Sequence, residues 1–303
     1  MSPEQRLESA VEEFRTVEVP GAVLAVSGPP AGAGDGRPPA LFVHGLGGSG
    51  DNWTDLMAAL SDEVDGEAVD LPGFGHSAPP LDGNLSVSGH VRAVIGYLEE
   101  TGRGPVHLFG NSMGGAVAVR LAALRPDLVR SLTLISPALP ELPPQHGAWP
   151  TALLALPGVP ALLRSGALRP RSPEEATEGL LRLVYGDTTT IAADRRERAV
   201  AEYRRRSGLP YAVQVMVGSA RGIVSAYTER GDQSLWRQAE QVKAPVLLVY
   251  GLKDRLVSYR SARRACAAFA DARLLVLPDS GHVAMMEHPE QVARAVRELL
   301  AES

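Results

Sequence analysis

The 303-residue sequence contains a single cysteine, Cys266, which excludes an intramolecular disulfide and a zinc site built on several cysteines. It has no run of about 18 apolar residues, so no segment is expected to cross a bilayer. Charge of one sign is not in excess, because 30 Lys and Arg stand against 35 Asp and Glu. A mildly acidic chain with a net charge of −5 has no electrostatic reason to bind nucleic acid.

Targeting and repeat signals are absent as well. The first residues, MSPEQRLESAVEEF, are mixed in charge and have no apolar segment, so they do not resemble a signal peptide and we expect a cytoplasmic protein without a stable membrane anchor. No internal repeat or low-complexity tract occurs. With 45% hydrophobic and 21% charged residues, the chain has the composition of an ordinary globular protein and ample material for a core.

Short apolar runs alternate with helical patterns along the chain. The runs are continuously apolar, which is typical of strands covered on both faces. Strands are expected at 40–45, within 66–75, and at 105–110, 131–136, 245–251 and 272–278, and helices at 52–60, 88–100, 113–124, 234–241, 259–270 and 288–301. This alternation predicts an α/β fold with a mostly parallel sheet flanked by helices. Residues 18–28 are expected to add antiparallel edge strands.

One long region breaks the alternation. Between Ser136 and Pro245 no strand pattern occurs, and apolar and arginine-rich helical patterns follow a proline-rich loop. We therefore expect a first core part at 1–137, a helical cap at 138–230 and a second core part at 231–303. Ligands of parallel sheets bind outside the carboxyl ends of the strands, so the cap would lie above that crevice. The arginine-rich stretch 195–206 is interpreted as a solvated helix face, with a phosphate site as the alternative.

The motif GNSMGG at 110–115 follows one expected strand and precedes an expected helix. G-x-S-x-G in that context predicts a nucleophile elbow, a sharp strand-to-helix turn that projects Ser112 above the sheet. Gly110 and Gly114 would keep the crowded turn free of Cβ clashes. The backbone N–H of Met113 would then point at a developing oxyanion. A glycine-rich turn with a helix-capping serine is the structural alternative.

A serine nucleophile needs a base and an orienting acid. His282 lies in a glycine-flanked loop just after the last expected strand, and Asp254 follows the strand 245–251. The order of the three residues along the chain is serine, acid, histidine, as in the α/β-hydrolase arrangement. The structural alternatives are a surface loop position for His282 and an ion pair or helix cap for Asp254.

The loop HGLGGSGDNW at 44–53 is the expected source of a second oxyanion donor. The N–H of Leu46 is the best candidate within it. The turn DLPGFGHS at 70–77 is best explained by turn chemistry. The same loop also fits the dinucleotide fingerprint G-x-G-x-x-G, with Asp70 in the place of a ribose-binding acid. We disfavour that alternative, because Asp51 at the helix start would repel a pyrophosphate.

These motifs together resemble those of the α/β-hydrolase superfamily, over nearly the whole chain. The segments that carry the resemblance are HGLGG, DLPGFGHS, GNSMGG, YGLKD and SGH. The resemblance implies a sheet of about eight strands with a helical cap inserted after the sixth. By position it implies Ser112 as nucleophile, Asp254 as acid and His282 as base. Capped esterases, lipases and C–C bond hydrolases look most similar.

The expected function is hydrolysis of carboxylic esters of apolar acyl or aryl substrates through an acyl-enzyme intermediate, as a carboxylesterase. The partner would be a small-molecule ester, and neither a metal nor an organic cofactor is implied. The expected substrate-binding residues are Trp149, Met216, Val283 and Met285. Two alternatives stay open: a C–C bond hydrolase acting on a ring-cleavage diketone, and a small-ligand receptor on the same fold.

The sequence departs from the C–C hydrolases at two places. Their oxyanion loop reads Gly-x-Gly-Pro, whereas no proline follows Gly47 here. They also tend to have tryptophan after the Gly-His pair, where this chain has Val283. Asn111, immediately before the serine, is the residue that resembles their elbow.

Overall fold

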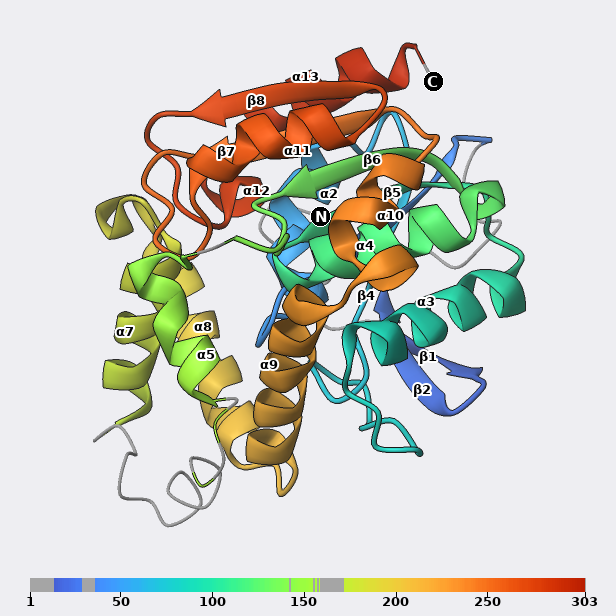
Figure 1. Cartoon of the computed structure of the whole chain (residues 1–303). Coiled ribbons are helices and arrows are strands. Elements are labelled where there is room, and N and C mark those ends of the chain that lie inside the picture. The colour runs from blue at the N-terminus through green and yellow to red at the C-terminus, as the bar shows by residue number, and fades with distance from the viewer. Residues whose placement is uncertain are drawn as a thin grey trace.

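The computed structural model of the chain describes residues 14–28, 36–141, 143–154, 156, 158 and 172–302 (Figure 1). Its centre is an eight-stranded sheet in the order β1-β2-β4-β3-β5-β6-β7-β8. The strands are β1 (Phe14–Val19), β2 (Ala22–Ser27), β3 (Pro39–Val43), β4 (Asp65–Val69), β5 (Val106–Asn111), β6 (Val129–Ile135), β7 (Val246–Gly251) and β8 (Ala272–Leu277). The strands expected from the apolar runs all form, and the fold class is confirmed.

The sheet is parallel from β4 to β8, and only β1 and β2 run antiparallel to their neighbours. The β1–β2 pair is a tight hairpin of antiparallel edge strands, as expected, but it begins at Phe14, before the expected range 18–28. Pro20 and Gly21 occupy its turn, where Gly21 has a φ of +81°. Proline followed by a glycine of positive φ is a sequence that favours a type II turn.

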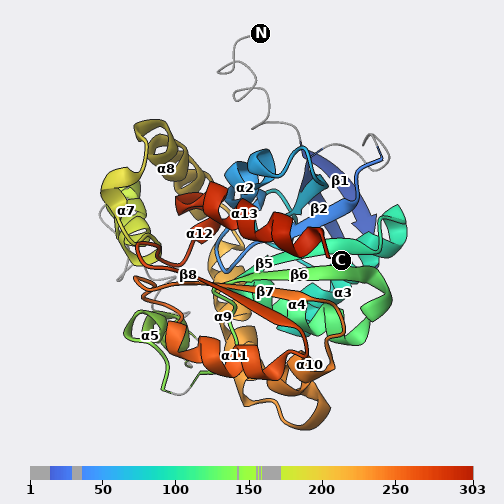
Figure 2. The ribbon, with the colours of Figure 1, turned by 90° about the horizontal axis from the view of Figure 1, so that it is seen from above.

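Helices cover both faces of the sheet (Figure 2). One face is covered by α2 (Thr54–Ala59) and α13 (Pro289–Leu300), and the other by α3 (Val87–Thr101), α4 (Met113–Leu124), α10 (Leu235–Gln241) and α11 (Ala262–Ala268). The short helix α12 (Ala284–Glu287) connects β8 to α13. This two-sided cover explains the unbroken apolar runs, because neighbouring residues of one strand enter different cores.

Strand β3 illustrates the two cores. Leu41 and Val43 belong to the larger hydrophobic core, together with residues of α3 and α4. Phe42, between them, points the opposite way and stacks on Phe109 of β5, with ring centroids 4.2 Å apart. The ring of Trp53 also packs against Phe42, with ring centroids 5.4 Å apart. Period-two side-chain alternation with burial on both faces thus produces a run without polar residues.

The expectation of cover on both faces is wrong for β8. Leu274 and Val276 of this strand are 44% and 36% exposed, although the run ARLLVL is as apolar as the others. β8 is an edge strand that pairs only with β7. Helix cover thins out at a sheet edge, so apolar composition alone does not distinguish an edge strand from a central one.

Between β6 and β7 the described residues contain no strand, which confirms a helical insertion after the sixth strand. Its helices are α5 (Trp149–Leu154), α7 (Pro173–Val184), α8 (Ala193–Ser207) and α9 (Ala212–Thr228). We call these four helices and their connections the cap. Helices α5, α7 and α8 lie beyond the carboxyl ends of β6 to β8 (Figure 1). The division of the chain at 138 and 230 stays a prediction, and residues 159–171 of this segment are outside the described part.

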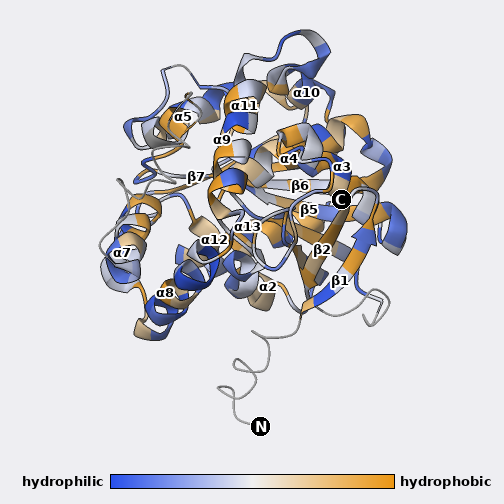
Figure 3. Ribbon diagram, turned by 90° about the horizontal axis from the view of Figure 1, so that it is seen from below, coloured by the Kyte–Doolittle hydropathy of each residue, from blue (hydrophilic) through white to orange (hydrophobic). Residues whose placement is uncertain are grey.

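Hydropathy differs sharply between the layers (Figure 3). The central strands are hydrophobic, whereas α8 is largely hydrophilic, with six arginines among its residues. Among the described residues, no helix combines the length and the apolar character needed to cross a bilayer.

Candidate active site

Ser112 lies in a strained turn between β5 and α4. Its φ of +53° and ψ of −116° fall in a region that residues other than glycine rarely adopt and that costs about 1–3 kcal/mol. Packing enforces the turn: a Cβ on Gly110 would lie 2.5 Å from the carbonyl oxygen of Gly114, and a Cβ on Gly114 would collide with the carbonyl of Val43. The surrounding backbone therefore requires glycine two residues before and two residues after the serine, as the elbow motif predicts.

The hydroxyl of Ser112 is accessible although its neighbours are not. Ser112 is partly exposed, while Asn111 and Met113 on either side are buried. Within the described residues the hydroxyl makes no hydrogen bond, and the N–H groups of Met113 and Leu46 have no acceptor. Catalytic hydrogen bonds often form only when substrate is bound, so a partly exposed serine with an unpaired hydroxyl is a competent ground state.

Asp254 and His282 form a buried hydrogen-bonded pair. Asp254 follows β7 and His282 follows β8, and Asp254 Oδ2 lies 2.9 Å from His282 Nδ1. The other carboxylate oxygen, Oδ1, accepts the N–H groups of Leu256 at 2.7 Å and Val257 at 3.0 Å. Lys253 pairs with Asp279, so it does not compete for the Asp254 carboxylate. Two of the three residues expected to act together are thus in direct contact.

The charge of Asp254 is stabilised locally. Burial disfavours the ionised carboxylate, but attraction to His282, their hydrogen bond and the N–H of Val257 outweigh this effect, so the pKa of Asp254 lies below its ordinary value. An ionised Asp254 accepts a proton-bearing Nδ1, which leaves Nε2 of a neutral His282 as an acceptor. That tautomer is the one a general base requires.

Asn111 connects the elbow to the loop of His282. Its side-chain Nδ2 donates to the carbonyl of His282 at 3.0 Å and to the carbonyl of Ile135 at 3.0 Å. This positioning role was not expected from the sequence. The available signal was a polar residue at the end of an otherwise buried apolar strand, because a buried amide needs partners.

Glu287 supports the same loop from the other side. Its carboxylate accepts the N–H of Gly281 at 2.7 Å, the hydroxyl of Ser280 at 3.2 Å, and the N–H of Gly186 at 2.7 Å. Gly186 belongs to the cap, just after α7, and the carbonyl of Val184 beside it accepts the N–H of His282 at 2.7 Å. The cap therefore contacts the histidine loop directly, which the sequence did not indicate.

The loop after β3 packs on the elbow. A Cβ on Gly45 would lie 3.0 Å from the Cβ of Ser112, so only glycine allows this approach. His44 Nε2 accepts the N–H of Leu71 at 2.9 Å, and Nδ1 lies 2.7 Å from the carbonyl of Gly45, to which it donates. Burial is the main reason that the pKa of His44 is lowered, so this ring is neutral and holds two loops together.

Asp70 is occupied by backbone contacts. One carboxylate oxygen accepts the N–H of Gly50 at 2.7 Å and the other accepts the N–H of His76 at 2.8 Å. The carboxylate is buried and organises the turn 70–77 beneath the loop of Leu46. This arrangement supports turn chemistry for the motif and leaves no carboxylate oxygen without a partner for a ribose hydroxyl.

The four residues expected to bind substrate lie in different surroundings. Met216 of α9 reaches the oxyanion loop, since its Cε would be 3.1 Å from a Cβ on Gly47. Val283 is buried beside His282, and Met285 is completely buried in the core beneath α13. Trp149 of α5 is 48% exposed. Substrate contact stays a prediction for all four.

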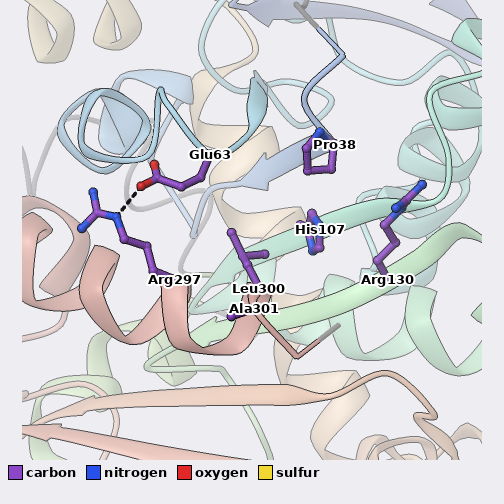
Figure 4. A pocket seen from close by; sticks show the side chains of 7 residues that line it. All are labelled: Pro38, Glu63, His107, Arg130, Arg297, Leu300 and Ala301. Carbon is purple, nitrogen blue, oxygen red and sulfur yellow. Dashed lines mark hydrogen bonds and ion pairs between the residues drawn. The ribbon is translucent and has the colours of Figure 1, made fainter.

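A surface hollow at the amino ends of the strands is separate from this site (Figure 4). It is lined by Pro38, Glu63, His107, Arg130, Arg297, Leu300 and Ala301. His107 is the second residue of β5, whereas Ser112 follows its last residue, so the two lie toward opposite ends of one strand. Burial, with Arg130 nearby, lowers the pKa of His107 to about 4, which makes it a neutral structural residue bonded to Ser131. In the described part of the chain, no cluster of three His, Cys, Asp or Glu could hold a metal ion.

Comparison with known proteins agrees with this fold. A family model for the alpha/beta hydrolase fold matches residues 38–289. The chain is 33% identical over 263 residues to the dihydrolipoyllysine-residue acetyltransferase component of an acetoin cleaving system from Pseudomonas putida, covering 86% of this chain but only 62% of that protein. It therefore spans about three fifths of that relative's length.

Two further matches are a relative and a solved structure. Monoacylglycerol lipase ABHD6 of Homo sapiens is 27% identical over 272 residues, which cover 88% of this chain and 76% of that protein. A solved meta-cleavage product hydrolase from Pseudomonas fluorescens IP01 superimposes with a TM-score of 0.76 at 21% identity, over 95% of this chain and 97% of the other. At that identity the likeness shows the fold alone.

Proposed function

The chain belongs to the α/β-hydrolase family, and from that premise we propose that it is a serine carboxylesterase acting on esters with apolar acyl or aryl groups. The observation that carries the proposal is the buried Asp254–His282 pair, tied through Asn111 to the strained turn of an accessible Ser112. All of these residues lie at the carboxyl ends of β5, β7 and β8, where ligands of parallel sheets bind.

In the proposed reaction, His282 Nε2 takes the hydroxyl proton while Ser112 Oγ attacks the ester carbonyl carbon. The N–H groups of Leu46 and Met113 stabilise the tetrahedral oxyanion, each contributing about 3 kcal/mol. His282 then protonates the departing alcohol, which leaves the acyl group on Ser112. A water molecule deprotonated by His282 attacks the acyl-enzyme, and the carboxylic acid is released. Asp254 keeps the imidazole in the productive tautomer throughout.

The proposed substrate class rests on the apolar groups around the oxyanion loop. Leu46 and Met216 are partly buried and pack on the larger core, and Val283 is buried beside the base. The name of the human relative, a monoacylglycerol lipase, is that of an ester hydrolase and favours the same choice. A small-molecule ester as the only partner and a cytoplasmic location belong to this proposal.

C–C bond hydrolysis of a ring-cleavage diketone is the second candidate. Asn111 before the serine favours it, and its contact with the carbonyl of His282 gives that residue a defined place. The absence of proline after Gly47 and the presence of Val283 after His282 count against it. The receptor alternative would keep the same residues and turn over slowly or not at all.

Initial rates on p-nitrophenyl esters, from acetate to palmitate, test the proposal with Ser112→Ala beside the wild type. Because the triad acts as a unit, the variant is expected to lose about a million-fold in kcat. Ser61→Ala, at an exposed serine two residues after α2, is the matched control and should keep full activity.

The outcomes separate the candidates. A Ser112→Ala variant that retains more than a few per cent of activity refutes the assignment of the nucleophile. A folded wild type that hydrolyses no ester but cleaves a ring-cleavage diketone would support the C–C hydrolase. Stoichiometric binding of such ligands without turnover would support the receptor.

A further inference from the structure

The arginines of α8 differ in their partners. Five of the six form ion pairs with carboxylates: Arg195 with Asp55, Arg196 with Glu178, Arg198 with Asp194, Arg204 with Glu174 and Arg205 with Glu202. Arg206, the last of the six, forms no ion pair with any residue that the structure describes. The carboxylate partners account for the other five arginines, so Arg206 requires a separate explanation.

Arg206 is instead bound to the loop of the proposed oxyanion hole. Its Nη1 donates to the carbonyl of Gly47, and its guanidinium lies 5.9 Å from the ring centroid of Tyr203. Burial lowers the pKa of Arg206, and attraction to Glu202 offsets this only in part. Withdrawing a charge from water without a bonded carboxylate is costly. The cost is consistent with a role at the loop rather than with a contribution to stability.

Gly47 is where such a contact acts on the loop. It has a φ of +74°, and a Cβ there would lie 3.1 Å from Met216 Cε and 3.4 Å from Arg206 Nη1. The N–H of Gly48 donates to the carbonyl of Gly45 at 3.1 Å, so residues 45–48 form one turn. Leu46, with its unpaired N–H, lies inside that turn. A guanidinium fixed on the Gly47 carbonyl therefore restrains the direction of the Leu46 N–H.

We propose that Arg206 is a positioning residue, which holds the turn Gly45–Gly48 from the cap so that the Leu46 N–H faces the oxyanion. The inference rests on the proposed function, because the oxyanion belongs to the ester reaction. Displacing a donor by a fraction of an ångström weakens stabilisation of the transition state more than binding of the ground state. Loss of Arg206 should therefore lower kcat and leave KM nearly unchanged.

Arg205 provides a matched control on the same helix. It also donates to a core carbonyl, that of Gly75 at 2.8 Å, but in the turn 70–77 rather than in the oxyanion loop. Replacing either arginine with methionine removes one charge and one contact between the cap and the core. Only the Arg206 variant should affect the oxyanion.

The test compares Arg206→Met, Arg206→Lys and Arg205→Met with the wild type in kcat and KM on the best nitrophenyl ester. Arg206→Met is expected to lose about 10- to 100-fold in kcat with KM within about twofold. Arg206→Lys should recover part of the loss, because an ammonium can still donate to the Gly47 carbonyl. Arg205→Met should stay within about threefold of the wild type.

A second readout is the rate constant for labelling of Ser112 by a fluorophosphonate, followed by mass spectrometry. The phosphoryl oxygen would occupy the oxyanion site, so this rate should fall by the same factor as kcat in Arg206→Met. The reagent needs an activated serine and no ester substrate. It therefore still tests Arg206 if the wild type proves inactive on esters, an outcome that would sink the proposed function alone.

Three results would overturn the inference. An unchanged kcat and labelling rate would show that the contact has no catalytic consequence. A loss confined to KM would assign Arg206 to substrate binding. An equal loss in Arg205→Met would indicate general docking of the cap. Thermal unfolding of each variant is measured alongside, and if Arg206→Met is unfolded, Arg206→Lys and Arg206→Gln decide by the same criteria.

Discussion

The turn that carries Ser112 and the loops that face it are held in place by different parts of the molecule. The serine turn is fixed mainly by the core, through Gly114, which packs against the backbone of β3, and through the N–H of Ala116 in α4, which donates to the Ser112 carbonyl. The N–H of Ala138, just after β6, donates to the same carbonyl. The loops of His282 and Leu46 are fixed partly by the cap. Val184 accepts the N–H of His282, and Arg206 donates to Gly47.

This difference has a mechanistic consequence. The strained conformation of Ser112 is set by close backbone packing, which leaves it no room to relax. The base and the oxyanion donor are placed by hydrogen bonds that cross from one unit to another. A change in the cap should therefore alter reactivity without altering the serine turn. Substitutions in the core and in the cap distinguish these two kinds of support.

After Ser112→Ala, the largest effect is expected on the core side, from Asp254→Asn. The asparagine can present an N–H to Nδ1 of His282, which favours the wrong tautomer and leaves Nε2 protonated. We expect kcat to fall by about ten-thousand-fold with little change in unfolding temperature. Asp279→Asn in the neighbouring loop, where Asp279 is exposed and pairs with Lys253, is the control for loss of one carboxylate. A loss below about tenfold would remove Asp254 from the catalytic group.

A smaller effect is expected where the cap meets the histidine loop. In Glu287→Gln, an amide NH₂ replaces one of two oxygens that accept backbone N–H groups, so one donor faces another. We expect kcat to fall by about tenfold because the His282 loop is less well held. Stopped-flow or steady-state rates with the nitrophenyl ester measure the change.

Glu290→Gln, on the exposed first turn of α13, is the control for that experiment. Equal rates in wild type and Glu287→Gln would mean that the contact between the cap and the His282 loop does not help to place the base. The support of the Leu46 loop by the cap would still be tested by the Arg206 variants.

What the sequence predicted follows the same division. Glycine spacing in the sequence predicts the elbow. Apolar runs predict the buried central strands and the strands that the acid and the base follow. Asp254 and His282 each follow a strand, and parallel strands bring their carboxyl ends together. The fold class and these contacts could therefore be anticipated from short segments.

The cap contacts had no comparable signal. Arg206 and Gly47 are 159 residues apart, and six arginines of one helix look alike until their partners are known. The exposure of Leu274 depends on β8 lying at the sheet edge, which is a property of strand order. Met285 and Met286 are adjacent, and only helix geometry buries the first completely while leaving the second near Asn52.

The smallest effect on catalysis, but a measurable one on stability, is expected at another contact between the core and the cap. His90 of α3 is fully buried, and its Nε2 lies 3.3 Å from the hydroxyl of Ser219 on α9. Burial, with the nearby His44, lowers the pKa of His90 to about 3 from 6.5. The folded chain thus keeps this ring neutral, whereas the unfolded chain binds a proton below about pH 6.5.

Stability contributed by the neutral ring is therefore complete above pH 6.5 and is lost progressively as the pH falls toward 3. At pH 5 the loss for this group amounts to about 2 kcal/mol in the free energy of unfolding. Chemical denaturation at pH 7.5 and pH 5 should show that His90→Gln, which cannot be protonated, loses less stability between the two values than the wild type. His76→Gln, at an exposed histidine, should fall as the wild type does. The glutamine side chain cannot take up the proton that destabilises the wild type at low pH. If His90→Gln shows the same pH dependence of unfolding as the wild type, protonation of His90 does not cause the loss of stability in acid.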